Sequence, residues 1–297
     1  MSKIKDQIEI EKRLADKELE ASEPKDYAFN EELHLHSFQG KPLCGTSTVL
    51  NVLAKPLTWW ASGLAVAKLG WTNSKIKIDG NYTNIDLETR LKALQPQYEA
   101  IKAMSSEQFL GLLDEAYKAH STNLKSTAQA GTDLHAELER YVKNWMLCHD
   151  PKNKGGDMLD ETIYDDRIIP FITWADENIE KFLWSELYCF SETLWLGGIS
   201  DVGVLLKNGK VGILDFKSSK ESYDNQFIQN AGYDLQITEN GGYTKEGNKI
   251  FQLDTPISFY GIVPFGAKEF TVDFRYNVEE LREGFKSALV LYKLLNK

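Results

Sequence analysis

Residues 183–219 have the sequence LWSELYCFSETLWLGGISDVGVLLKNGKVGILDFKSS. The stretch is rich in aromatic and β-branched residues and is interrupted by glycines, which is the pattern of short strands joined by turns. It therefore predicts three successive antiparallel strands. The segments before and after it have a different hydrophobic period, so this stretch marks where the sheet of the protein begins.

Segments with helical periodicity lie on both sides of these strands. They cover residues 46–71 with a break at Pro56, 87–119 with breaks near Pro96 and Ser105–Ser106, 127–148, 163–182, 223–237 and 278–295. Two more strands are predicted at 257–265 and near 268–275. This order predicts an α/β fold (mixed α+β), in which helices flank a central sheet and a helical elaboration precedes it.

The composition is that of a folded chain. The 297 residues are 42% hydrophobic and include 7 Trp, 13 Tyr and 14 Phe, which a disordered chain would not carry. No window holds 18 apolar residues, and the first 20 residues alternate charges, so neither a membrane span nor a signal peptide is predicted. Cys44, Cys148 and Cys189 are too far apart for a CxxC metal pair and odd in number. We therefore expect a cytoplasmic protein with no membrane partner.

The formal charge of −10 argues at first against a nucleic-acid partner, but it is unevenly distributed. Residues 1–40 carry a net −4 and residues 131–190 a net −7, whereas residues 41–130 carry a net +3. The basic region interleaves lysines with tryptophans: Lys55, Lys68, Lys75, Lys77, Lys92 and Lys102 with Trp59, Trp60 and Trp71. We expect 1–40 to be a charged extension and 41–130 a strand-binding arch, in which lysines meet phosphates and aromatic rings stack on bases. The alternative is that the tryptophans pack in a core.

The hairpin register decides whether Asp201 and Asp215 meet. A two-residue turn at Asn208-Gly209 would place Asp201 opposite Phe216. A three-residue loop over 207–209, with Gly209 left-handed, places Asp201 opposite Asp215 instead. Two carboxylates so close would repel unless a cation lay between them, so the second register predicts a divalent-metal site. Lys217 lies on the same strand face as Asp215, although an Asp-x-Lys pair alone is more often a surface salt bridge.

The order of these residues resembles the PD-(D/E)XK nuclease superfamily, in particular its RecB-type exonuclease branch. Asp201 followed after 13 residues by Asp215-Phe216-Lys217 resembles the two-part motif of that superfamily. Gly131-Thr132-Asp133-Leu134-His135, at the head of a predicted helix, resembles the upstream G-x-x-x-H element of the branch. Glu186 and Gln229-Asn230-Ala231-Gly232-Tyr233 resemble its strand glutamate and its Q-x-x-x-Y helix. The resemblance implies a restriction-endonuclease-like mixed sheet.

The match covers about residues 44–240 in order. Thr46-Ser47-Thr48-Val49-Leu50, with Lys55-Pro56 and Trp59-Trp60, resembles the N-terminal element of phage and mitochondrial genome maintenance exonucleases. Ser200 departs from the family pattern, which has proline there. Some relatives carry a four-cysteine iron–sulfur cluster, which three cysteines cannot ligate, so no cluster is expected. In domain terms, 41–297 is expected to be one nuclease domain, with the arch at 41–130 and a catalytic core at 131–297.

The resemblance also implies roles for individual residues. Asp201, Asp215 and the main-chain carbonyl of Phe216 would ligate Mg²⁺ or Mn²⁺, and His135 would add a nitrogen ligand that suits Mn²⁺. The remaining catalytic candidates are Lys217 on the attacking water or developing charge, Glu186 holding a metal-bound water, and Gln229 and Tyr233 orienting Lys217 or the phosphate. Without the resemblance, His135 would be interpreted as a core or capping residue, and Gln229 and Tyr233 as part of a packing face.

The function expected from this pattern is a metal-dependent DNA exonuclease that hydrolyses phosphodiester bonds at strand ends in recombination, repair or phage genome processing. Two alternatives stay open: an endonuclease of the same fold, and a catalytically silent subunit that binds nucleic acid or protein. The sequence has no GxxxxGK[ST] helicase motif, so unwinding would need a helicase or recombination protein as partner. A phage-encoded protein would act in the host cytoplasm.

Overall fold

A computed structural model describes residues 26–54, 58–78, 81–150 and 164–296 of the chain. These residues group into two compact units, one within Met1–Ala54 and Asp133–Lys297 and the other within Lys55–Thr132. The first unit holds the sheet, and the second is mainly helical. Among the described residues, no helix is long and apolar enough to cross a membrane.

The centre of the first unit is the predicted meander, now seen as β7 (Ile179–Ser191), β8 (Leu196–Leu206) and β9 (Val211–Lys217). Within the described residues it belongs to an eight-stranded sheet of order β11-β10-β7-β8-β9-β12-β13, with β4 paired to β8. The other strands are β4 (Cys44–Gly45), β10 (Gly242–Tyr243), β11 (Lys249–Phe251), β12 (Phe259–Pro264) and β13 (Asp273–Arg275). The sheet is mixed, because β9 with β12 and β4 with β8 are parallel while the other pairs are antiparallel.

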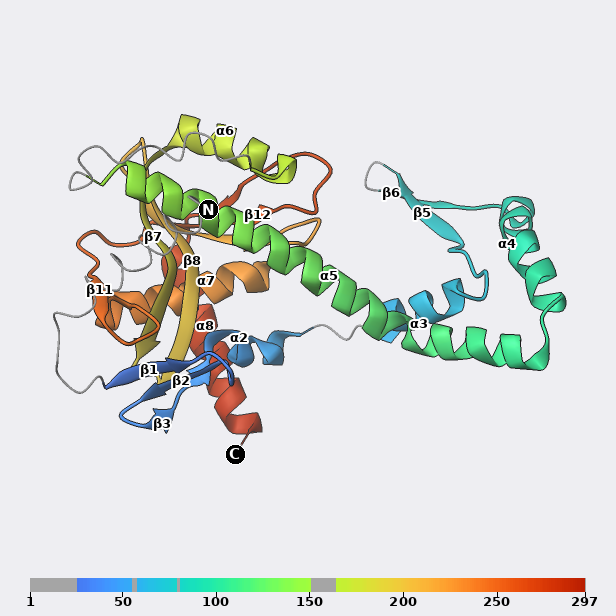
Figure 1. The fold of residues 1–297 in the computed structure, drawn as a ribbon, viewed down its shortest axis with the longest axis horizontal. Helices are drawn as coiled ribbons and strands as arrows, with labels where there is room; N and C mark the ends of the chain where they lie inside the picture. Colours follow the sequence, from blue (N-terminus) through green and yellow to red (C-terminus); the bar gives the residue numbers. More distant parts are fainter. Residues whose placement is uncertain (1–25, 55–57, 79–80, 151–163, 297) are drawn as a thin grey trace, which may run out of the picture. The chain divides into compact units, whose positions relative to one another are not determined.

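Helices cover both faces of this sheet (Figure 1). On one face pack α7 (Asp224–Asn240), α8 (Val278–Leu295), α2 (Thr46–Val49) and the 3₁₀ turn η1 (Leu50–Leu53). On the other face pack α6 (Ile169–Asn178) and the last turns of α5 (Ser106–Cys148). The predicted class, a mixed α/β fold with helices against a central sheet, is therefore confirmed.

Two predicted boundaries in this unit are wrong. The helix expected over 163–182 comprises η2 (Asp166–Ile168) and α6 only, and β7 already begins at Ile179. The predicted extension over 1–40 is folded where it is described, because β1 (Tyr27–Asn30), β2 (Leu35–Phe38) and β3 (Lys41–Pro42) form a small antiparallel sheet. Tyr27 and Phe38 are buried there against Phe190, an aromatic contact between distant segments that local charge patterning does not reveal.

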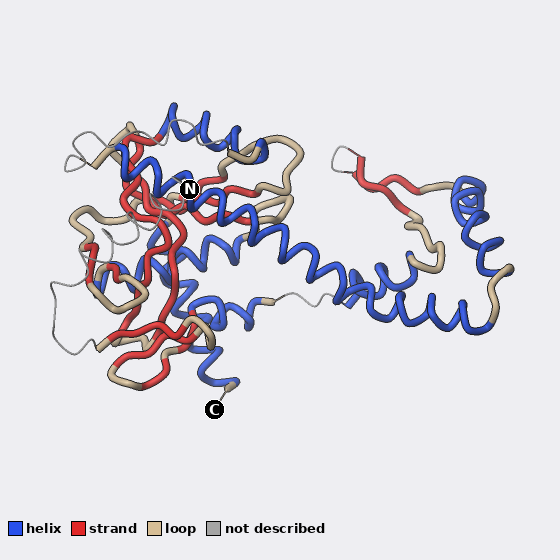
Figure 2. The backbone as a smooth tube through the Cα atoms, viewed as in Figure 1, coloured by secondary structure: helices blue, strands red, loops and turns tan. Residues whose placement is uncertain are grey.

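The second unit contains α3 (Thr58–Ala67), α4 (Leu87–Lys102), the first part of α5, and a hairpin of β5 (Lys75–Ile78) and β6 (Asn81–Asn84). Figure 2 shows its helices in blue and the hairpin in red. The sequence did not predict this hairpin. Pro96 lies inside α4 and does not end it. The helix predicted over 127–148 is wrong in its start, since α5 runs unbroken from Ser106, and Gly131 is therefore not at a helix head.

Candidate active site

The hairpin register predicted for Asp201 and Asp215 is confirmed. Strands β8 and β9 pair Val202 with Leu214 and Leu205 with Val211, and the Leu206 N–H donates to the Lys210 carbonyl. The turn is closed by a left-handed glycine, Gly209, with φ +82°. In this register the residue opposite Asp215 is Asp201.

Strands β8 and β9 separate immediately beyond the last pair, Val202 with Leu214. The Phe216 N–H is satisfied by a side chain, because it donates to Asp201 Oδ2 at 2.9 Å. Strand β9 continues alongside β12 instead, as far as Lys217 opposite Pro264. The candidate site therefore lies at a fork in the sheet, where a carboxylate takes the place of a main-chain acceptor.

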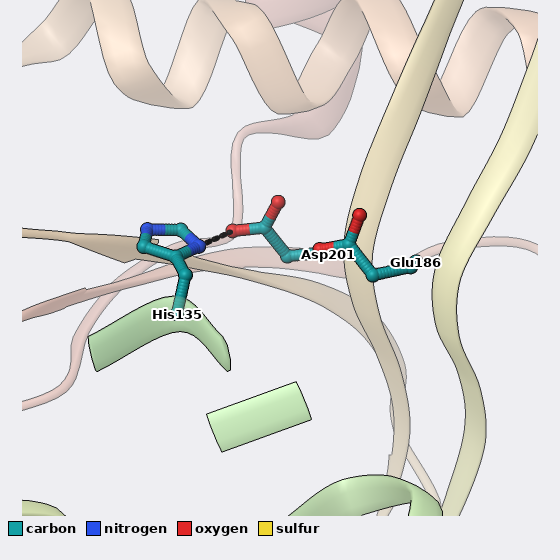
Figure 3. Close-up of side chains that lie close together, drawn as sticks. All are labelled: His135, Glu186 and Asp201. Atoms are coloured by element: carbon teal, nitrogen blue, oxygen red, sulfur yellow. Dashed lines mark ion pairs between the residues drawn. The ribbon is translucent and has the colours of Figure 1, made fainter. Parts of the chain in front are cut away.

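Three side chains converge at this fork and offer metal-ligand atoms within 4.8 Å of one another: His135, Glu186 and Asp201. His135 projects from α5, and its Nδ1 lies 3.8 Å from Asp201 Oδ2 (Figure 3). Glu186 lies on β7 at the level of Asp201, since its neighbours Ser185 and Leu187 pair with Val202 and Ser200. Two carboxylates and an imidazole are a ligand set that Mn²⁺ or Mg²⁺ accepts.

Glu186 has an unusual backbone for a residue inside a strand. Its φ is +51°, in the left-handed region that side-chain-bearing residues rarely adopt. Trp184 and Leu187 are three residues apart and lie in the same core cluster, which strict alternation along a strand would not allow. The left-handed backbone of Glu186 rotates the strand between them, so that both side chains reach the same face of β7. Backbone strain at a candidate ligand is a feature of functional sites.

Asp215 and Lys217 form a tight ion pair beside this group. The Lys217 Nζ lies 2.9 Å from Asp215 Oδ1, to which it donates, and 2.7 Å from Oδ2. The side chain of Asp215 is 2% exposed. The metal ligands predicted from the sequence therefore differ from the three-residue group, which contains Glu186 and lacks Asp215. Ligation by Asp215 and by the Phe216 carbonyl stays a prediction.

The carboxyl groups of the fork are electrostatically crowded. Burial raises the pKa of Glu186 to about 8, and the Asp201 charge adds to this effect. Burial also raises the pKa of Asp215 to about 7 although Lys217 opposes it, and raises the pKa of Asp201. Burial and the Lys217 charge lower the pKa of His135. Burial alone would lower the pKa of Lys217, but the two aspartates outweigh it and the pKa is raised. A cation here would relieve the repulsion among these three acids.

Gln229 and Tyr233 lie one turn apart on α7, as the sequence predicts. The Gln229 Nε2 donates to the Tyr233 hydroxyl oxygen at 2.6 Å. Tyr233 is buried, and burial together with the charges of Asp215 and Asp201 raises its pKa well above the ordinary value. The phenol is therefore close to the fork and keeps its proton.

Glu139 is a residue near the fork that was not predicted from the sequence. It lies one turn after His135 on α5, and its charge acts on the pKa values of His135, Glu186 and Asp201. Its carboxylate forms an ion pair with Lys143 on the next turn. The His-x-x-x-Glu spacing, which puts both side chains on one helix face, was the signal that could have revealed it.

In the second unit, large aromatic side chains are exposed rather than packed. Trp59 is 91% exposed, Tyr117 is 87% exposed and Tyr82 is 73% exposed. Helices α3 and α4 contain no fully buried residue. The core-packing alternative is therefore wrong for Trp59, while Lys55 lies outside the described residues.

Comparison with known proteins assigns no relative: no family model matches the chain, and no curated protein matches it.

Proposed function

We propose that this protein is a divalent-metal-dependent DNA exonuclease of the PD-(D/E)XK type, similar to the RecB branch. The observation that carries the proposal is the convergence of Asp201, Glu186, His135 and the Asp215–Lys217 pair at one fork of the sheet. These residues come from three successive strands and from α5, which precedes the strands in the chain. An ordinary surface salt bridge between Asp215 and Lys217 would not need His135, Glu186 or Asp201 beside it, and its aspartate would not be buried.

The architecture supports the same proposal. A restriction-endonuclease-like core is a mixed sheet with helices on both faces, and the sheet described here has that form. The two acids and the lysine lie on the neighbouring strands β8 and β9 at the point where these strands diverge.

The donor atoms fit a divalent cation. Asp215 Oδ2 is buried and accepts no hydrogen bond of acceptable geometry, although it lies against the Lys217 ammonium. His135, Glu186 and Asp201 would hold the cation, with Asp215 as a further oxygen donor. When bound, Mg²⁺ or Mn²⁺ would lower the pKa of a water ligand and neutralise charge on the phosphate.

The chain's own residues supply positioning and charge. Asp215 holds the Lys217 ammonium in place, and this half-buried cation would stabilise negative charge that develops on the scissile phosphate. Tyr233 keeps its proton and can donate a hydrogen bond, while Gln229 fixes the direction of the phenol. Asp201 cannot swing freely, because the Phe216 N–H donates to it.

The second unit would handle the DNA strand. Unpaired bases can stack on exposed aromatic rings irrespective of sequence, and Trp59, Tyr82 and Tyr117 offer such rings. Lys68, Lys92 and Lys102 are exposed there and can meet phosphates. Both features favour a single-stranded segment or a strand end as substrate.

The test is digestion of end-labelled linear DNA, single- and double-stranded, with Mg²⁺, Mn²⁺ or EDTA. We expect metal-dependent nucleotide release that is abolished in Asp201→Asn and Lys217→Met and retained in Asp224→Asn, a control whose side chain is 89% exposed. Cutting of closed circular DNA would favour the endonuclease instead. No release by wild type, with no heat of metal binding in calorimetry, would refute the enzyme and favour a silent subunit.

A further inference from the structure

A buried polar network joins the first residue of α2 to β8 and α7. The Thr46 Oγ1 donates to the Gly197 carbonyl at 3.1 Å and accepts from the Gln236 Nε2 at 2.7 Å. The Gln236 amide also donates to the Gly232 carbonyl at 2.8 Å, and the Cys189 thiol donates to its Oε1. Thr46 and Gln236 are both buried, so one buried hydroxyl links a strand to a helix.

Strand β8 and helix α7 approach each other unusually closely at this network. A Cβ on Gly198 would lie 2.7 Å from Thr46 Oγ1 and 2.7 Å from Cε1 of Tyr233. A Cβ on Gly232 would lie 2.6 Å from Thr46 Cγ2. Real Cβ atoms do not come so near other heavy atoms, so only glycine fits at both positions. Thr46 fills the space between the two glycines, and the Tyr233 ring lies directly against β8.

Tyr233 connects this packing to the fork. It follows Gly232 on α7 and accepts the hydrogen bond from Gln229. It lies against β8 at Gly198, three residues before Asp201. A shift of α7 relative to β8 would therefore move the phenol and the amide away from the Asp215–Lys217 pair, because Thr46 and Gln236 set that spacing.

We infer that Thr46 and Gln236 are positioning residues, which hold α7 against β8 so that Tyr233 and Gln229 face the fork. Neither side chain belongs to the metal group, and the network fixes the helix that carries Tyr233 and Gln229. The catalytic consequence depends on the proposed nuclease function, whereas the placement of Tyr233 does not. The inference gives a role to the Thr46-Ser47-Thr48 segment, which the proposed chemistry does not use.

The substituted side chains can be chosen by their chemistry. Valine has the shape of threonine but accepts no hydrogen bond, so Thr46→Val frees the Gln236 amide and the Gly197 carbonyl. Serine keeps the hydroxyl and loses only the methyl group. Ser258→Ala is the matched control, because its Oγ also donates to a main-chain carbonyl, that of Val211, at the other end of β9.

In the activity assay we expect Thr46→Val to lower kcat about tenfold while KM and the calorimetric Mn²⁺ affinity stay unchanged, since a small misplacement of a positioned group costs rate rather than binding. Thr46→Ser and Ser258→Ala should keep the wild-type kcat. In a Tyr233→Phe background the effect of Thr46→Val should shrink, because the positioned hydroxyl is already gone. An equal loss of kcat in both backgrounds would overturn the inference, as would equal effects of Thr46→Val and Ser258→Ala.

A second measurement needs no enzyme activity. With 3-fluorotyrosine incorporated at position 233, the ¹⁹F resonance should move or broaden in Thr46→Val and keep its position in Thr46→Ser and Ser258→Ala. If Thr46→Val does not fold, Gln236→Met removes the same bond from the other side. An unchanged resonance in the folded variant refutes the positioning role. A shifted resonance in a protein that releases no nucleotides would sustain that role and reject the nuclease.

Discussion

Because the backbone of Glu186 is left-handed, we expect glycine to be more stable than alanine at this position, which is the reverse of the order at ordinary strand positions. At a usual strand position glycine is less stable than alanine by roughly 0.5–1 kcal/mol, because the unfolded chain is freer. At φ +51° alanine carries the steric cost of the left-handed region, about 1–2 kcal/mol, and glycine carries none. We therefore expect Glu186→Gly to be about 1 kcal/mol more stable than Glu186→Ala.

The assay is thermal and urea unfolding of both variants in EDTA. A difference of about 1 kcal/mol corresponds to a Tm difference of about 2–4 °C for a folding unit of this size. The matched pair is Lys181→Gly and Lys181→Ala, at an exposed position of the same strand with no positive φ, where alanine should be the more stable. If Glu186→Gly is no more stable than Glu186→Ala, the backbone at position 186 is not strained.

Three further predictions concern charge and metal. Burial lowers the pKa of His36 to about 4. Between about pH 6.5 and pH 4 this histidine is therefore protonated in the unfolded chain and neutral in the folded chain. The His36 contribution to stability should therefore fall by about 2 kcal/mol between pH 8 and pH 5, so the stability of wild type relative to His36→Asn should decrease by that amount in urea unfolding at the two pH values. Mn²⁺ at a hundred times its Kd should stabilise wild type by about 2.7 kcal/mol and leave Asp201→Asn unchanged, as calorimetry and Tm would show. Arg282→Met should cost about 3 kcal/mol in urea unfolding, because it leaves the buried Asp234 carboxylate without the guanidinium that donates to both its oxygens.

Each of these has a control within the chain. His34 is exposed on the same strand hairpin, so His34→Asn should keep the pH dependence of wild type. Mg²⁺ and Mn²⁺ should stabilise His135→Ala no more than they stabilise Asp201→Asn. Arg275→Met removes a distant, exposed pair with Asp224 and should cost less than 1 kcal/mol. Equal losses for the two arginine variants would contradict the burial argument.

The sequence predicted those parts of the fold that depend on local chemistry. The helix over 278–295 was predicted with its observed limits, because its amphipathic pattern is uninterrupted. The hairpin register followed from the glycine of a tight turn, and with it came the apposition of Asp201 and Asp215. Sequence spacing was sufficient for these features because they are decided within about 20 residues.

Features that depend on distant contacts were not predicted. Nothing local indicates that Tyr27 would pack on Phe190, so the first strands were missed. The backbone of Glu186 is set by which face of β7 the flanking residues must bury, and only the assembled core decides that. The membership of Glu186 in the metal group likewise requires three strands and α5 to be in place.

The bond between the Phe216 N–H and Asp201 has a consequence for how descendants of this protein would diverge. The side chain at position 201 has a structural role in addition to the proposed metal ligation, because its oxygen accepts the Phe216 N–H. This acceptor is needed even in a protein that has lost catalysis. Aspartate or asparagine would therefore persist at 201 under selection for folding alone. Position 186 has the reverse preference, because its strained glutamate favours drift to glycine once function is lost. Among related sequences, a glutamate at position 186 would therefore indicate retained activity more reliably than an acidic residue at position 201.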